Sequence, residues 1–193
     1  MMNDTEIHHK ITQALERISK TFRVLLWEES KKHKISPIQI QILIFCLTHK
    51  QEMSKVSFLA KEFDLTKATI SDSVRVLLQK ELLIKVPDTY DSRSYSLQLT
   101  TNGRNIAKQT VNYTEALDTS IASLNDTEKG QFLNNLLNII ERLNKKSVIS
   151  VQRMCLTCYH YSKSGNKHYC NFLKKPLENS ELRVDCPEHK MVE

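Results

Sequence analysis

The sequence is poor in the residues that break helices. Its 193 residues include only three glycines and four prolines, so we expect an ordered, helix-rich chain rather than a disordered one. No apolar run approaches the roughly 20 residues that cross a bilayer, and the first residues, MMNDTEIHHK, carry neither the apolar stretch nor the cleavage site of a secretory signal. We therefore expect a cytoplasmic protein without a membrane-spanning segment.

The common catalytic motifs are also missing. The sequence has no glycine-rich phosphate loop, no nucleophile elbow and no His-Glu-x-x-His pair, so we expect that the protein is not an enzyme. Its length suffices for one ordinary domain with a small appendage. The net charge of +6 suits a polyanionic partner, although many unrelated proteins are as basic.

Helical periodicity covers the first part of the chain. Apolar residues recur every three or four positions from Thr5 to Lys31, which predicts one long helix. Ser36-Pro37 predicts the start of a second helix, because serine caps helices and proline fits their first turn. A short helix is expected from Val56 to Asp64, then a turn and a further helix that Thr66 caps. This order is typical of a helix-turn-helix.

The helix predicted from Leu65 to Glu81 has one apolar and one polar face. The apolar face carries Ile70, Val74, Leu77 and Leu78. The opposite face therefore carries Thr69, Asp72, Arg75, Val76 and Gln79. After Glu81 apolar residues recur at every second position, which predicts a pair of strands around the polar tip PDTYDSRS. A helix joined in this way to a two-stranded wing with an arginine at its tip is a device for docking on DNA.

Two more helices are expected after the wing. The first is a long one capped by Thr100 or Thr101, and the last is capped by Asp126 or Thr127. Together with the first helix they carry more apolar surface than a small winged domain can cover. This excess predicts a helical homodimer interface.

Several segments combine into a specific pattern: the helix Leu65–Glu81, the LLIK step into the wing, Asp91-Ser92-Arg93-Ser94 at its tip, and LQLTTNG from Leu97 to Gly103. In this combination residues 5 to 148 resemble the MarR family of bacterial transcriptional regulators. The resemblance implies an obligate homodimer with two winged helices on successive major grooves of a pseudo-palindromic operator. It also implies repression that a small-molecule ligand or an oxidant relieves, with the 65–81 helix on base edges and Arg93 in the minor groove.

The polar face departs from that family at two positions. Asp72 and Val76 stand where the family frequently has basic residues. Asp72 either accepts a hydrogen bond from a cytosine amino group or pairs with Arg75 one turn on, and we favour the pairing. Lys67 is expected on a phosphate, because phosphates receive most interface hydrogen bonds. The candidate DNA-binding residues are Thr66, Lys67, Thr69, Asp72, Arg75, Gln79, Arg93 and Ser94.

A second candidate site lies after residue 151, where the composition changes. It comprises Cys155-x-x-Cys158, Cys170 and Cys186, with His160, His168 and His189 nearby. A C-x-x-C turn lets two thiolates reach one metal, and two more cysteines complete a tetrahedral site. A segment of about 40 residues has too little apolar surface to fold alone, whereas a structural metal supplies on the order of 10 kcal/mol.

The sequence does not determine which metal these cysteines bind. The wide cysteine spacing and the histidines favour zinc, whereas the proline after Cys186 favours an iron–sulfur cluster. A metal-free or disulfide-switching tail is the third alternative. The resemblance does not cover this tail and does not decide between them. Cys46, within ILIFCLT, is expected to be a buried small hydrophobe, and Trp27 to serve packing rather than to border a ligand cavity.

The sequence thus predicts a mainly α-helical fold with a small β wing. The expected order is a dimerisation helix in residues 1–35, a winged helix-turn-helix domain in 36–100, dimerisation helices in 101–150 and a metal-stabilised cysteine tail in 151–193. We expect a homodimeric regulator, a repressor, that binds double-stranded DNA and carries a structural or sensory four-cysteine site for zinc or an iron–sulfur cluster. The alternative is a redox or iron–sulfur protein in which the cysteine cluster is the primary functional site.

Overall fold

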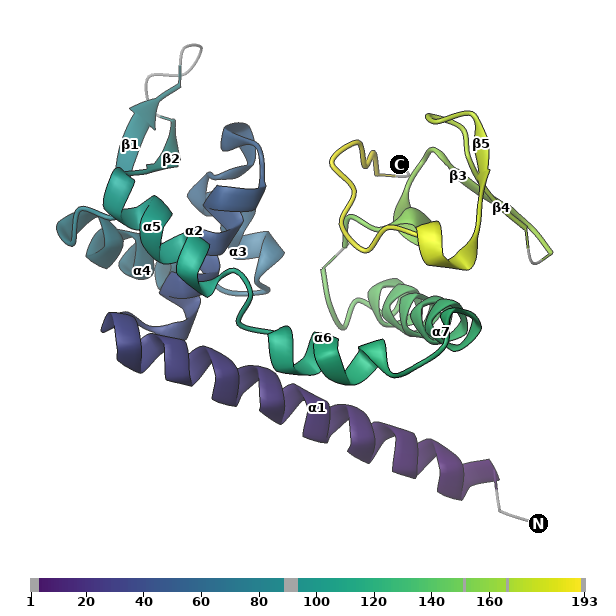
Figure 1. The fold of residues 1–193 in the computed structure, drawn as a ribbon. Coiled ribbons are helices and arrows are strands. Elements are labelled where there is room, and N and C mark those ends of the chain that lie inside the picture. Colours follow the sequence, from purple (N-terminus) through teal and green to yellow (C-terminus); the bar gives the residue numbers. More distant parts are fainter. Residues whose placement is uncertain (1–3, 89–93, 151, 166, 192–193) are drawn as a thin grey trace. The chain divides into compact units, whose positions relative to one another are not determined.

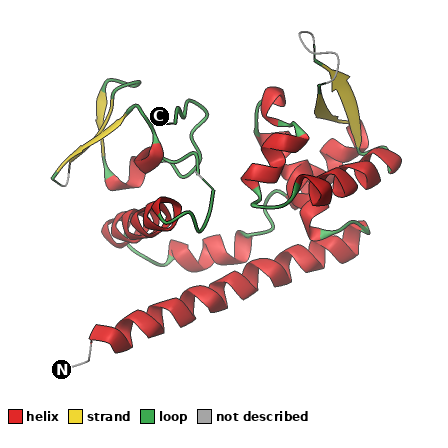
Figure 2. Cartoon of the chain, turned by 180° about the vertical axis from the view of Figure 1, so that it is seen from behind, coloured by secondary structure: helices red, strands yellow, loops and turns green. Residues whose placement is uncertain are grey.

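The computed structural model describes residues 4–88, 94–150, 152–165 and 167–191. Helices dominate these residues, and strands are confined to two small sheets (Figures 1 and 2). The chain forms two compact units: Met1–Leu59 with Thr66–Leu117, and Ala60–Leu65 with Asp118–Glu193. In the described residues no helix combines the length and apolarity needed to span a membrane. The predicted mainly α-helical class with an antiparallel wing is confirmed.

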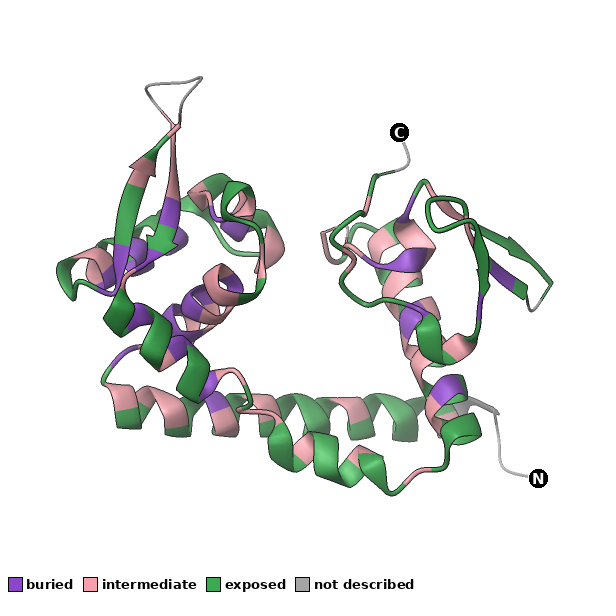
Figure 3. Cartoon of the chain, turned by 45° about the horizontal axis from the view of Figure 1, so that its top comes forward, coloured by how far each residue is buried: buried purple, intermediate pink, exposed green. Residues whose placement is uncertain are grey.

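The first unit begins with α1 (Asp4–His33) and α2 (Pro37–Thr48), followed by the short 3₁₀ helix η1 (Gln51–Met53). Ser36 caps α2 as predicted, since its Oγ accepts from the backbone N–H of Gln39 while the Gln39 side chain accepts from Ser36 N–H. Buried residues gather in α2, whereas α1 is mostly exposed (Figure 3). The core of this unit therefore lies around α2 and not along α1.

The helix-turn-helix consists of α3 (Val56–Glu62) and α4 (Lys67–Gln79). Because Thr66 caps α4 and the chain turns at Glu81 with φ of 55°, the helix is two residues shorter at each end than predicted. Strands β1 (Leu83–Pro87) and β2 (Tyr95–Leu99) then pair in antiparallel register. The predicted strands of the wing are thus present.

The single long helix expected after the wing is interrupted, so that prediction is wrong. The structure has α5 (Thr101–Thr110) and α6 (Glu115–Ala122), separated by four residues of turn. The buried hydroxyl of Thr110 donates to the carbonyl of Ile106, one turn back, a bond that tends to bend helices. Beyond it, Tyr113 and Glu115 donate to carbonyls three residues back, which tightens the chain into turns.

The second unit is built on α7 (Asp126–Lys145). Its cap is Asn125, in a reciprocal pair with Glu128, and not Asp126 or Thr127 as predicted. After α7 come η2 (Cys155–Thr157), β3 (Tyr161–Ser164), β4 (Lys167–Cys170), β5 (Lys175–Leu177) and η3 (Asn179–Glu181). The three strands form one antiparallel sheet in the order β3-β4-β5, which the sequence pattern did not predict.

Apolar residues of the cysteine tail pack against one side of α7. Leu137 of the helix is fully buried with Met154, Cys155, Leu177 and Leu182, and Leu133 and Ile140 join the edge of this cluster. Part of the apolar surface that the sequence assigned to a dimer interface is therefore covered within the same chain. The tail has a core of its own that includes a cysteine side chain.

Candidate nucleic-acid interface and cysteine cavity

The outer face of α4 presents the predicted polar residues to solvent. Thr66, Lys67, Thr69, Asp72, Arg75 and Gln79 are all exposed. On the opposite face Ile70, Val74 and Leu77 are buried, and so is Ser73, whose hydroxyl donates to the carbonyl of Thr69. Val76 is half-buried. The predicted division of this helix into a packed face and a free face is confirmed.

Asp72 and Arg75 form an ion pair on that free face. The Arg75 Nη2 atom donates to Asp72 Oδ1 at 2.8 Å, and the two side chains keep 65 % and 71 % of their surface exposed. An exposed pair of this kind adds little stability, about 0.2–1 kcal/mol. Its two members can therefore exchange this contact for others at small cost.

The wing is fastened to the body at both strands. The backbone N–H of Leu97 donates to the carbonyl of Ser54 at 2.9 Å, and Lys55 Nζ lies 2.6 Å from Asp88 Oδ2. Lys85 Nζ stands 4.5 Å above the ring of Tyr95 on the paired strand, a cation–π contact. Ser94 is half-buried, and its carbonyl accepts from Asp88 N–H. The predicted tip residue Arg93 lies outside the described residues.

The part of the chain that holds the exposed polar helix and the two-stranded wing is similar to a known family. Residues 33–94 match the model of the MarR family. The match runs from the end of α1 to the wing. No curated protein sequence matches the chain.

Solved structures share the MarR-like fold. The MepR–DNA complex of Staphylococcus aureus is 24% identical, with a TM-score of 0.60 over 68% of this chain and 97% of MepR. FabT of Streptococcus pneumoniae in complex with DNA is 24% identical, with a TM-score of 0.58 over 70% and 99% of the two chains. A MarR transcriptional regulator from Methanosarcina mazei Go1 is 17% identical, with a TM-score of 0.59 over 71% and 98%. About 30% of this chain therefore has no counterpart in these solved structures.

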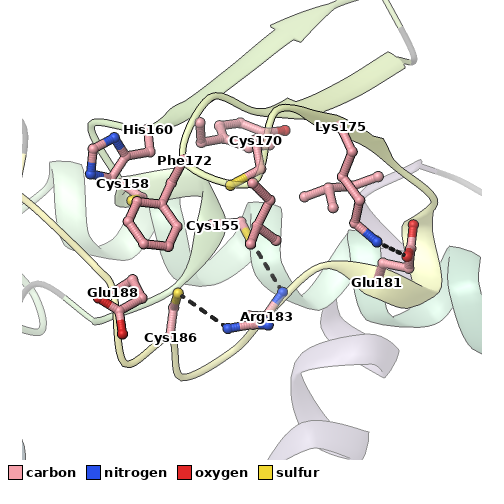
Figure 4. A pocket seen from close by; sticks show the side chains of 13 residues that line it. Cys155, Cys158, His160, Cys170, Phe172, Lys175, Glu181, Arg183, Cys186 and Glu188 are labelled. Atoms are coloured by element: carbon pink, nitrogen blue, oxygen red, sulfur yellow. Dashed lines mark hydrogen bonds and ion pairs between the residues drawn. The ribbon is translucent and has the colours of Figure 1, made fainter.

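The chain has a second candidate site in its cysteine tail, where four cysteines line one cavity of about 190 Å³ (Figure 4). Cys155 begins η2, Cys158 follows it, Cys170 ends β4 and Cys186 lies after η3. The structure describes all five cysteines of the chain and leaves each as a free thiol. It thus brings together the four predicted metal ligands. Within the described ranges, however, no three His, Cys, Asp or Glu side chains are close enough to hold a single metal ion.

Arg183 donates to two of the cysteine sulfurs, which sequence reasoning missed. Its backbone N–H lies 3.2 Å from Cys155 Sγ, and its Nη1 lies 3.8 Å from Cys186 Sγ. Burial raises the pKa of the Cys155 thiol, the Arg183 N–H lowers it, and the charges of Cys186, Cys170 and Cys158 raise it further. The net effect is that the Cys155 thiol holds its proton more firmly than a thiol in water.

The histidines near the cysteines differ in position. His168 is 3 % exposed, and its ring nitrogens already bond Tyr161 Oη at 2.6 Å and Asn179 Oδ1 at 2.9 Å. The pKa of Tyr161 is raised to about 12, first by burial and then by Cys155 and Glu141, so its hydroxyl keeps its proton beside His168. His189 Nε2 contacts Thr157, while His160 lines the cavity beside Phe172. His168 is thus a structural link within the tail.

Arg153 holds the two ends of the tail together within the second unit. Its guanidinium lies 2.6 Å from Glu62 Oε2 and 2.8 Å from Asp185 Oδ1, and only 12 % of its side chain is exposed. Its carbonyl also accepts from the backbone N–H of Cys186 at 2.7 Å. The lone arginine carried no signal in the sequence, because its acidic partners lie 91 and 32 residues away.

Proposed function

We propose that this chain is a homodimeric transcriptional regulator of the MarR family, a repressor, that recognises a specific site on double-stranded DNA. The observation that carries the proposal is the exposed polar face of α4 beside the wing, in the region that the family model matches. Two structural neighbours, MepR and FabT, are described in complexes with DNA, which supports the same partner for this chain. The net charge of +6 supports a polyanionic partner.

In this proposal α4 enters the major groove and the wing reaches the neighbouring backbone. Thr66, Lys67, Thr69, Asp72, Arg75 and Gln79 face the DNA from α4, with Ser94 and Arg93 on the wing. Lys67 is the first residue of α4 and is exposed, so its charge suits a phosphate. On a matching site Arg75 leaves Asp72 and donates to a base edge, which the exposure of both side chains allows.

The homodimer of this proposal is supported by apolar side chains that the single chain leaves exposed. On α1 these are Ile11, Ile18, Val24 and Trp27, and on α7 they are Phe132, Ile139 and Leu143. Trp27 keeps 55 % of its surface exposed, which is unusual for the largest side chain in the sequence. A second copy of the chain is the partner that would cover such surfaces.

The tail of the proposed regulator holds a metal centre on Cys155, Cys158, Cys170 and Cys186. Support comes from the shared cavity and from the N–H donors of Arg183 on two of the sulfurs. Both zinc and iron–sulfur clusters take four cysteine ligands. The centre either braces the fold or acts as a sensor whose loss changes DNA binding. Stripping the metal from a still-folded dimer and measuring affinity for the operator separates these two roles, because a structural centre leaves the affinity of the folded dimer unchanged.

The DNA-binding proposal is tested by Arg75→Ala. Loss of one specific base contact is expected to weaken binding to the selected operator by about 1–3 kcal/mol, measured by fluorescence anisotropy. The matched control is Lys20→Ala, because Lys20 is also an exposed cation in a helical ion pair, with Glu16 on α1. Equal affinities of Arg75→Ala and the unmodified protein would remove α4 from the interface.

A further inference from the structure

The four cysteines of the tail come from separate elements and surround a common space. Cys155 begins η2 and Cys158 follows it, Cys170 ends β4, and Cys186 lies in the loop after η3, where its N–H donates to the carbonyl of Arg153. In Figure 4 the four sulfur atoms stand around the cavity wall rather than meeting at one point. This arrangement differs from that of a closed zinc site. There, four sulfurs lie about 2.3 Å from one ion and therefore about 3.8 Å from one another.

The size of the space suits a group of several atoms. The cavity of about 190 Å³ exceeds more than tenfold the roughly 10–15 Å³ that a cavity needs to hold one water molecule. A single zinc ion is smaller than a water molecule and would leave most of this volume unfilled unless the walls collapsed. An iron–sulfur cluster has a core of several iron and sulfide atoms, with cysteine sulfurs on its outside.

The lining also suits such a cluster. Apolar and aromatic side chains make up much of the wall, namely Tyr161, Phe172, Leu173 and Leu177. The Arg183 N–H at 3.2 Å from Cys155 Sγ and its guanidinium near Cys186 Sγ are the kind of donors that stabilise cluster thiolates and set reduction potentials. The positive charge of Arg183 would offset the negative charge of a core ligated by four thiolates.

We propose that this cavity holds an iron–sulfur cluster whose ligands are the sulfurs of Cys155, Cys158, Cys170 and Cys186. The inference rests on the part of the proposed function that assigns a metal centre to these cysteines, and it decides between zinc and iron. It does not depend on DNA binding. His168 is excluded as a replacement ligand, because its two ring nitrogens bond Tyr161 and Asn179.

The test uses the full-length protein purified without oxygen. We expect iron and acid-labile sulfide in equal amounts and a broad visible absorbance that fades in air. Cys155→Ser, Cys158→Ser, Cys170→Ser and Cys186→Ser should each lose most of the iron and the colour. Cys46→Ser is the matched control, because this fifth cysteine lies in α2 and does not line the cavity, and this variant should keep both the iron and the colour. Zinc as the only metal, or metal-free protein that fails to take up iron and sulfide on reconstitution, would overturn the proposal.

A second variant covers the case in which the serine variants fail to fold. Arg183→Gln keeps all four ligands and the backbone donor but removes a positive charge beside the cluster. We expect it to retain iron and to show a more negative reduction potential in an electrochemical titration followed by electron paramagnetic resonance. An unchanged potential would contradict a cluster in this cavity. Protein that contains iron but binds no operator would refute the DNA-binding proposal and support the cluster. Protein that contains only zinc but binds the operator would refute the cluster and support DNA binding.

Discussion

Gly103 explains at the residue scale why the wing returns to helix through the sequence LQLTTNG. A Cβ atom at this position would lie 1.9 Å from the carbonyl oxygen of Leu82, so only glycine lets α5 approach the start of β1 this closely. The same carbonyl accepts from Thr100 N–H at 3.2 Å, and the Thr100 hydroxyl donates to Glu81 at 2.7 Å. This junction fixes the wing beside the end of α4.

Gly103→Ala is expected to lower the free energy of unfolding. Because the added methyl group meets backbone rather than a flexible side chain, α5 and the wing junction must shift, at a cost of about 1–3 kcal/mol. Chemical denaturation measures the loss. The control is Asn102→Ala, one residue earlier and exposed, which should change stability by less than about 0.5 kcal/mol. Equal stability of Gly103→Ala and the unmodified protein would show that the close approach is absent.

The lowered pKa of His189 predicts that the free energy of unfolding depends on pH. Its pKa is lowered, first by burial, so the folded state binds a proton less readily than the unfolded state. The unfolded state therefore gains protons first as the pH falls below about 6.5, and stability declines until the folded-state pKa is passed. The difference in unfolding free energy between pH 7.5 and pH 5 should be smaller in His189→Gln than in the unmodified protein. If both proteins lose the same stability, His189 is not the group responsible.

Residue-scale predictions succeeded where the decisive partner is close in sequence. Ser36 and Thr66 cap their helices through N–H groups three residues on, which a local pattern reveals. Asn125 was missed in favour of Asp126 or Thr127, because three capping-type residues follow one another and only the pairing with Glu128 selects the first. Arg183 and Arg153 were missed because Cys155 and Glu62, their respective partners, lie 28 and 91 residues away and become neighbours only on folding.

At the level of secondary structure, α7 packs against the tail of its own chain, in addition to its role in the proposed dimer. Leu137, fully buried, packs with Met154, Leu177 and Leu182 of the tail. The apolar spacing of α7 predicted the helix correctly, but periodicity alone does not say which element covers the face. The sheet β3-β4-β5 was not predicted because its strands are only three or four residues long and their exposed sides are mostly polar.

Leu137→Ala is expected to loosen the tail. Removing a fully buried leucine side chain typically costs about 2–5 kcal/mol, and the cavity would open in the cluster that contains Met154 and Cys155. Limited proteolysis should then cleave the region after residue 151 faster than in the unmodified protein. Ile139→Ala on the same helix, where the side chain is 38 % exposed, should leave the cleavage rate nearly unchanged. Resistance of the Leu137 variant would mean that the tail is held by other contacts.

At the scale of the whole molecule, the proposed activity needs two copies of the chain. The two units of one chain leave apolar residues of α1 exposed, Trp27 and Val24 most of all. The sequence predicted the excess of apolar surface, and within the second unit the tail covers the part of it around Leu137 on α7. The operator sequence was not predictable, because it depends on base contacts made by the side chains of α4 on bound DNA.

Trp27→Glu is expected to weaken the homodimer, because a charge would replace an apolar side chain at the proposed interface. Light scattering after size-exclusion chromatography should show a concentration-dependent shift from dimer to monomer. Gln13→Glu adds the same charge at an exposed polar position of α1 and should stay dimeric. A monomeric unmodified protein would contradict the homodimer itself.

The proposed function depends above all on recognition of a specific DNA sequence by α4 and the wing. The most direct measurement is selection of bound duplexes from a random library by the anaerobically purified protein, followed by sequencing. The account predicts enrichment of an inverted repeat whose half-sites lie about 10 base pairs apart, and loss of this enrichment with Arg75→Ala. Recovery of unenriched DNA, or the same enriched sequence and affinity with Arg75→Ala, would contradict it.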